Sequence, residues 1–143
     1  VSSLLFVAFA VMDRNGNFLV GAVVDSAILV HLAVLRAGVH VPYRSRRVSS
    51  LGIMELVQGC RDGQEMRAVK EFIRENIADT VHPDERISEK AISLLERHAS
   101  VDGLRTVDAF VAATALQEED TLVTANHKHF RKIAGLNLLK FEP

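Results

Sequence analysis

The sequence predicts an α/β domain of three layers (α/β/α), with a central, mainly parallel β-sheet and helices on both of its faces. Short apolar segments typical of buried strands alternate with longer segments in which apolar residues recur at helical spacing. The chain has 143 residues. This length suits one domain, since domains cluster at about 100–150 residues.

The composition excludes several classes of protein. The chain is 48% hydrophobic and 24% charged, which excludes disorder along its whole length. Cys60 is the only cysteine, so an internal disulfide and a zinc site built from thiolates are both excluded. The formal net charge of −1 excludes a strongly basic nucleic-acid-binding protein. Any contact with nucleic acid must therefore be local.

Two apolar stretches, residues 1–12 and 18–41, raise the question of a membrane. The first is too short to span a bilayer, which takes about 20 apolar residues, and no basic segment precedes it as in a secretory signal. The second contains Asp25, and a carboxylate is costly at the centre of a bilayer. We interpret both stretches as buried segments, and expect a cytoplasmic protein with no membrane contact.

The start of the chain allows two interpretations. Residues 4–12 and 18–24 could be two strands around an Asn-Gly turn. Alternatively, residues 1–17 are an extension or extra strand, and the domain itself covers residues 18–143. Residues 18–24 are apolar on both sides, which is typical of a strand buried on both faces of a parallel sheet.

A helix is expected directly after this strand. Apolar residues recur at helical spacing from Ile28 to Leu35. Asp25 or Ser26 suits the N-cap position, and Gly38 suits the end of the helix.

The middle of the chain predicts two strands and three helices. Residues 48–51 form a short strand candidate, and a helix over 52–59 follows. Apolar residues on one face predict a helix over 65–77. Residues 78–81 form the next strand candidate, and a turn containing proline leads into an amphipathic helix over 86–98.

The last third of the chain continues the alternation. A loop over residues 100–105 precedes a helix over 107–117, whose alanines would allow it to lie close to a sheet. Residues 120–124 predict a strand, 127–134 a short helix and 136–141 a last strand.

Four polar residues fall where the predicted strands end. Asp25 ends the first strand, Glu55 lies one turn into the helix after the second, Asp108 opens the alanine-rich helix, and Asn126 follows the strand over 120–124. In an open parallel sheet, ligands bind beyond the carboxyl ends of the strands. These four residues come from separate elements and could meet at one edge of the sheet.

The carboxylates have a structural and a functional interpretation. Asp25 and Asp108 could simply be N-caps, each worth about 1 kcal/mol. Glu55 has apolar neighbours, so its helix is expected to be mostly buried, and a buried carboxylate needs a partner. Three converging carboxylates would raise one another's pKa. A divalent cation would resolve the repulsion, and oxygen ligands favour Mg²⁺ or Mn²⁺ over zinc.

Four segments resemble the motifs of a known family. They read VDSAILV at 24–30, SSLGIMELVQG at 49–59, GLRTVDAFVAATAL at 103–116 and LVTANHKHF at 122–130. These segments are similar to the motifs of PIN-domain ribonucleases, and within that family to the VapC-type toxins of prokaryotic toxin–antitoxin pairs. The resemblance covers about residues 20–141; the last two motifs are specific and the first is weak alone.

The resemblance implies a PIN-like fold and a metal-dependent RNA endonuclease. Asp25, Glu55 and Asp108 correspond to the family's three core carboxylates, which would hold Mg²⁺ or Mn²⁺. Asn126 stands where many members place a fourth acid, and we count it among the candidate catalytic residues. Ala27 departs from the polar residue often found at that position.

The resemblance also implies partners. We expect an RNA substrate, a cognate antitoxin protein that holds the toxin inactive, and a homodimer, with the segment over residues 65–98 as a candidate interface. The alternative is a catalytically weak PIN-like binding module that acts through protein partners, which the amide of Asn126 keeps open. A phosphoacceptor domain centred on Asp25 would need a second acid beside it, and none is evident.

Several other side chains have two interpretations. The basic residues could contact RNA phosphates, or they could form a solvated face or a surface for a partner's carboxylates. His127 and His129 could form a separate metal site, but exposure beside the site is expected. Cys60 and Phe130 are expected in the core. The basic residues form two clusters, Arg44, Arg46 and Arg47, and Lys128, Arg131 and Lys132.

Overall fold

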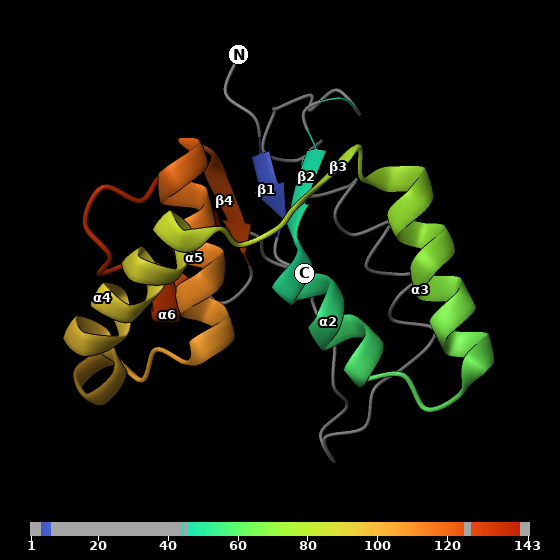
Figure 1. Ribbon diagram of the computed structural model, residues 1–143, viewed down its shortest axis with the longest axis horizontal. Helices are drawn as coiled ribbons and strands as arrows, with labels where there is room; N and C mark the ends of the chain where they lie inside the picture. Colours follow the sequence, from blue (N-terminus) through green and yellow to red (C-terminus); the bar gives the residue numbers. More distant parts are fainter. Residues whose placement is uncertain (1–3, 7–43, 45, 125–126, 141–143) are drawn as a thin grey trace.

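The computed structural model describes residues 4–6, 44, 46–124 and 127–140 (Figure 1). Short strands and one or two helices follow one another along these ranges, as the sequence predicts. The elements are β1 (Leu4–Phe6), β2 (Arg46–Ser49), α2 (Ser50–Gln58), α3 (Gly63–Asn76), β3 (Asp79–Val81), α4 (Glu85–Asp102), α5 (Thr106–Glu118), β4 (Thr121–Thr124), α6 (His127–Phe130) and β5 (Leu138–Lys140).

The strands form one parallel sheet in the order β3-β2-β1-β4-β5. In the centre, Leu5 lies opposite Arg47 of β2 on one side and Leu122 of β4 on the other. Figure 1 shows α4, α5 and α6 gathered beside β4, whereas α2 and α3 lie on the other side of the molecule. The predicted α/β architecture with a parallel sheet is therefore confirmed.

Only Leu4–Phe6 is described at the start of the chain, so the structure bears on the two interpretations there alone. Leu4–Phe6 is a strand, and it lies between β2 and β4. The strand predicted over residues 18–24 and the helix predicted after it lie outside the described residues. The division between residues 1–17 and 18–143 remains a prediction.

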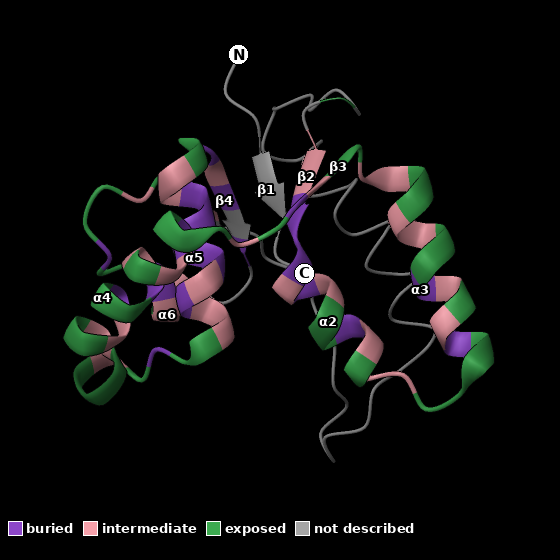
Figure 2. Cartoon of the chain, viewed as in Figure 1, coloured by how far each residue is buried: buried purple, intermediate pink, exposed green. Residues whose placement is uncertain are grey.

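The main core is built around α5. Ala109, Ala112 and Ala113 are fully buried, and α5 packs against α4, β4 and α6 (Figure 2). Alanine side chains let the backbone of a buried helix approach its neighbours closely, as predicted from the sequence. Leu122 and Phe130 are also fully buried in this cluster, which confirms Phe130 as a core residue.

A smaller core joins α2 to α3. Leu56 and Val69 are buried there, and Cys60, Phe72 and Ile73 pack against them. The Cys60 thiol is only partly buried and donates a hydrogen bond to the Leu56 carbonyl oxygen, 3.2 Å away. Burial raises the pKa of this thiol. Cys60 thus lies at the edge of the core rather than inside it.

Side-chain caps and one glycine set the ends of the helices. The carboxylates of Asp62 and Asp84 each accept a hydrogen bond from a backbone N–H three residues later, at 2.9 Å. The helix predicted over residues 86–98 continues to Asp102, so the expectation of a loop from residue 100 is wrong. The helix ends at Gly103, whose φ of 72° is in the left-handed region that glycine adopts without strain.

Arg47 binds carboxylates from three segments of the chain. Its guanidinium lies 3.1 Å from Asp79 at the start of β3, 3.1 Å from Glu118 at the end of α5 and 3.1 Å from Asp120 just before β4. The Asp120 side chain is only 2% exposed, and the Arg47 side chain is 18% exposed. Burial raises the pKa of Asp120, although the charge of Arg47 acts in the opposite direction.

This cluster corrects one expectation. The sequence groups Arg47 with Arg44 and Arg46 as a surface for RNA phosphates, a solvated face or a surface for a partner's carboxylates. Instead its guanidinium pairs with carboxylates of its own chain: Asp79 starts the adjacent strand β3, and Asp120 precedes β4, which lies beyond β1 in the sheet. Charge runs in a sequence do not show such tertiary partners.

We predict that Arg47→Met destabilises the domain by about 3–5 kcal/mol, because Asp120 would stay buried without its cation. Urea unfolding followed by circular dichroism measures this loss. The control is Arg74→Met, which removes an ion pair between exposed side chains and should cost less than about 1 kcal/mol.

The double variant Arg47→Met/Asp120→Asn separates the buried charge from the loss of packing. It should recover part of the stability lost in Arg47→Met, since the amide carries no charge to desolvate. Equal losses in Arg47→Met and Arg74→Met would contradict this account of the cluster.

Candidate active site

Glu55 and Asp108 come together at the carboxyl edge of the sheet. Glu55 lies in α2, which begins directly after β2, and Asp108 is the third residue of α5. The two helices pack against each other. Partial burial of the carboxylate and, next, the negative charge of Asp108 raise the pKa of Glu55, while the charge of Arg105 acts in the opposite direction. The two residues thus lie on helices in contact, and the charge of Asp108 acts on Glu55.

Asp108 does not cap its helix. The N-cap of α5 is Arg105, whose side chain makes no capping hydrogen bond. Asp108 lies inside the first turn, and its carboxylate Oδ2 is 3.1 Å from Nδ1 of His129. The interpretation of Asp108 as an N-cap is therefore wrong.

His129 reaches Asp108 from a separate element. It lies in α6, just after β4, and α6 packs on α5. Its side chain is half-buried rather than freely exposed, so the expected exposure is only partly correct. The position of His129 just after the carboxyl end of β4 is the sequence signal that could identify it, because α5, with Asp108 in its first turn, begins at the same edge of the sheet.

The helix that carries Glu55 is less buried than the sequence suggests. Ser50, Gly52 and Leu56 are its buried residues, Glu55 is exposed, and the Met54 side chain is 59% exposed. Apolar neighbours in sequence do not show which side of a helix is covered. Glu55 therefore stands at the surface of the edge, accessible to a ligand.

The other two predicted site residues, Asp25 and Asn126, lie outside the described residues. Within the ranges that the structure does describe, no group of three or more His, Cys, Asp and Glu side chains is placed to hold a metal ion. The described part of the site thus contributes two carboxylates, Glu55 and Asp108. Their oxygens are hard ligands that fit a divalent cation such as Mg²⁺ or Mn²⁺.

Positive charge at this edge comes from exposed side chains. Arg105 is exposed and close enough to lower the pKa of Glu55, and it is not among the site residues predicted from the sequence. In the second basic cluster, Lys132 pairs with Asp102 at 2.9 Å, while Lys128 and Arg131 are exposed.

One further observation concerns membranes. None of the helices in the described ranges is both long and apolar enough to cross a bilayer.

The fold is shared with solved toxin–antitoxin complexes. A DNA-bound VapBC from Salmonella typhimurium matches with a TM-score of 0.67 and 15% identity, covering 98% of each chain. VapBC-1 from nontypeable Haemophilus influenzae matches with a TM-score of 0.65 and 19% identity, covering 96% of each. A toxin–antitoxin complex from Klebsiella pneumoniae matches with a TM-score of 0.63 and 20% identity, covering 96% of this chain and 97% of the other. At these identities the likeness shows the fold alone.

No curated protein matches the sequence. The model of one protein family does match, over residues 22–136, and its family is described as the PIN domain. This range covers more than half of the chain and includes Glu55 and Asp108, the two carboxylates that meet at the carboxyl edge of the sheet. The chain therefore belongs to the PIN domain family.

Proposed function

We propose that this chain is a metal-dependent RNA endonuclease and the toxin component of a toxin–antitoxin pair, of the VapC type. The observation that carries the proposal is the meeting of Glu55 and Asp108, in a PIN domain, at the edge of a parallel sheet where ligands bind. The closing motifs of the sequence support the same assignment.

The proposed cofactor is Mg²⁺ or Mn²⁺, held by Asp25, Glu55 and Asp108, with Asn126 as a fourth residue of the site. A bound cation would lower the pKa of a water molecule and neutralise charge on the phosphodiester. His129 holds Asp108 in place: in the tautomer protonated at Nδ1, it donates a hydrogen bond to Oδ2 of Asp108. The exposed guanidinium of Arg105 is available to the substrate phosphate.

The proposed partners are an RNA substrate, an antitoxin and a second copy of the chain. The antitoxin is supported by the fold, which recurs in complexes of toxins with antitoxins. The dimer is supported by the α3–α4 region, where Ile92 leaves a large apolar side chain 57% exposed.

A catalytically weak PIN-like module that acts through protein partners is the second candidate. The residue that favours it is Asn126, an amide at a position where many family members carry an acid. Cleavage of RNA by the purified chain distinguishes the two functions.

Asp108→Asn should lower cleavage of total cellular RNA in Mg²⁺ by about 100-fold or more, because a metal contributes several kcal/mol to the transition state. The matched control is Asp84→Asn, since asparagine caps a helix as well as aspartate does; it should cut at the wild-type rate. Wild-type protein that cuts no RNA, or Asp108→Asn that cuts normally, would favour the binding module.

Glu55→Gln should make the domain more stable at neutral pH in a metal chelator. The pKa of Glu55 is raised in the folded state, so its ionised form costs stability once the pH rises above the ordinary glutamate value. Below that value, about 4.3, both states are protonated and the gain should vanish. Thermal melts at neutral pH and at about pH 4 measure it.

The control for this variant is Glu96→Gln, which changes an exposed glutamate on α4. Adding Mg²⁺ should reverse the order and favour the wild type, because the cation binds the carboxylate. A Glu55→Gln variant that is less stable than the wild type at neutral pH without metal would show that the ionised form of Glu55 does not cost stability in the folded state.

His129→Ala should lower cleavage about tenfold, the size of effect expected when the residue behind a metal ligand is removed. His129→Asn should retain most activity, since its amide can donate to Asp108. Lys128→Ala, a change at an exposed neighbour, serves as the control. If the asparagine variant is as slow as the alanine variant, the hydrogen bond at Asp108 does not position it.

A further inference from the structure

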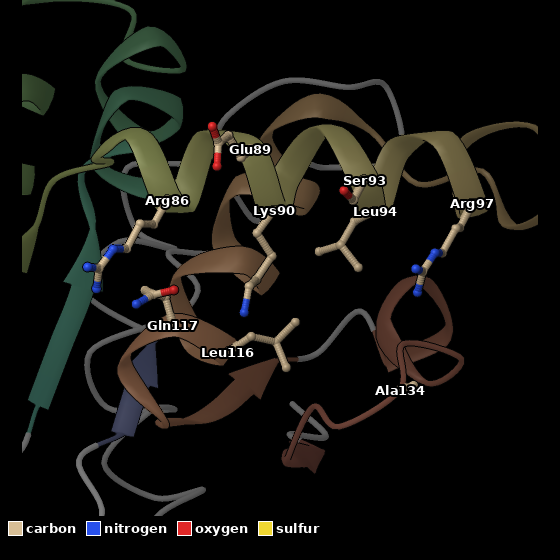
Figure 3. A pocket seen from close by; sticks show the side chains of 9 residues that line it. All are labelled: Arg86, Glu89, Lys90, Ser93, Leu94, Arg97, Leu116, Gln117 and Ala134. Carbon is tan, nitrogen blue, oxygen red and sulfur yellow. The ribbon is translucent and has the colours of Figure 1, made fainter.

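A groove lies between α4 and the end of α5, and Figure 3 shows its lining. Its volume is about 520 Å³, within the range of about 300–1,000 Å³ found for ligand sites. It contains neither Glu55 nor Asp108. The lining residues are Arg86, Glu89, Lys90, Ser93, Leu94, Arg97, Leu116, Gln117 and Ala134.

Three cations from one helix face this groove. Figure 3 shows the side chains of Arg86, Lys90 and Arg97 extending from α4 toward the end of α5 and Ala134. Glu89 supplies the one carboxylate among the lining residues. Within the described ranges, none of the three cations forms an ion pair. With three cations against the single carboxylate of Glu89, the lining of the groove carries an excess of positive charge.

The spacing of these cations suits an extended chain. Because an α-helix rises about 1.5 Å per residue, Lys90 lies about 6 Å beyond Arg86 along α4, and Arg97 about 10 Å beyond Lys90. Alternate side chains of an extended peptide are about 7 Å apart. Carboxylates on one side of an extended segment could therefore reach successive cations.

Apolar side chains form the other part of the groove. Leu94 is buried and Leu116 is partly buried, and Figure 3 shows the two side chains between Lys90 and Arg97. A segment that fills this groove would gain binding free energy from burying apolar side chains as well as from pairing its carboxylates with the cations.

We propose that this groove is a docking site for an acidic, amphipathic segment of a partner protein, bound in extended form. The carboxylates of the segment contact Arg86, Lys90 and Arg97, and its apolar side chains cover Leu94 and Leu116. This docking does not depend on whether the chain cleaves RNA.

Two observations favour a protein segment over single-stranded RNA. None of the nine lining residues is aromatic, whereas single-stranded nucleic acid is usually bound by stacking its bases on aromatic side chains. The groove also lies away from the candidate active site, because Leu116 is about 12 Å along α5 from Asp108.

The test measures binding of a fluorescent peptide of alternating Glu and Leu to the full chain, by anisotropy, in a metal chelator. Arg86→Glu/Arg97→Glu should weaken binding about tenfold or more, because two attractions become repulsions. The matched control is Arg67→Glu/Lys70→Glu, the same charge change on exposed residues of α3, which should bind the peptide within about twofold of the wild type.

The other outcomes overturn the proposal. No binding to the wild type, or equal weakening by both double variants, would show that the groove is only a solvated face. A single-stranded oligouridine that binds more tightly than the peptide, and loses affinity in Arg86→Glu/Arg97→Glu, would assign the groove to nucleic acid instead.

Discussion

The constraint on which the rest of the structure depends is the ion cluster of Arg47. The described strands are only three or four residues long, so each pair of strands shares few backbone hydrogen bonds. Arg47 joins the start of β3, its own strand β2 and the segment that leads into β4. In a parallel sheet, strands that are aligned at their starts are also aligned at their ends. The cluster therefore helps to set the edge at which Glu55 and Asp108 meet.

The carboxylates at the two edges of the sheet have different charged neighbours. At the amino edge, the buried carboxylate of Asp120 has a cation from its own chain 3.1 Å away. At the carboxyl edge, the negative charge of Asp108 helps to raise the pKa of Glu55, and the nearby Arg105 is exposed. A protein that needed these carboxylates only for stability could pair them as it pairs Asp120. This difference between the two edges supports the proposal that a cation binds at the carboxyl edge.

The sequence predicted what depends on local pattern. It identified the alternation of strands and helices, the alanine-rich helix and the approach of Glu55 and Asp108, because these follow from periodicity and from the geometry of parallel sheets. It could not identify the partners of Arg47 or the contact of His129 with Asp108, since residues far apart in sequence decide both. It also overestimated the burial around Glu55, because an apolar run does not show which face is covered.

Helix α5 links the regions that carry these properties. Asp108 lies in its first turn, its middle is buried against the sheet and α4, and Glu118 at its end binds Arg47. The position of Asp108 is thus determined from both ends of the helix, by His129 at the start and by the ion cluster at the finish. Because close-packed interiors transmit strain, a change at the Arg47 cluster would shift α5, whose last residue, Glu118, pairs with Arg47. The stability of the sheet and the position of Asp108 in the candidate site are therefore coupled through α5.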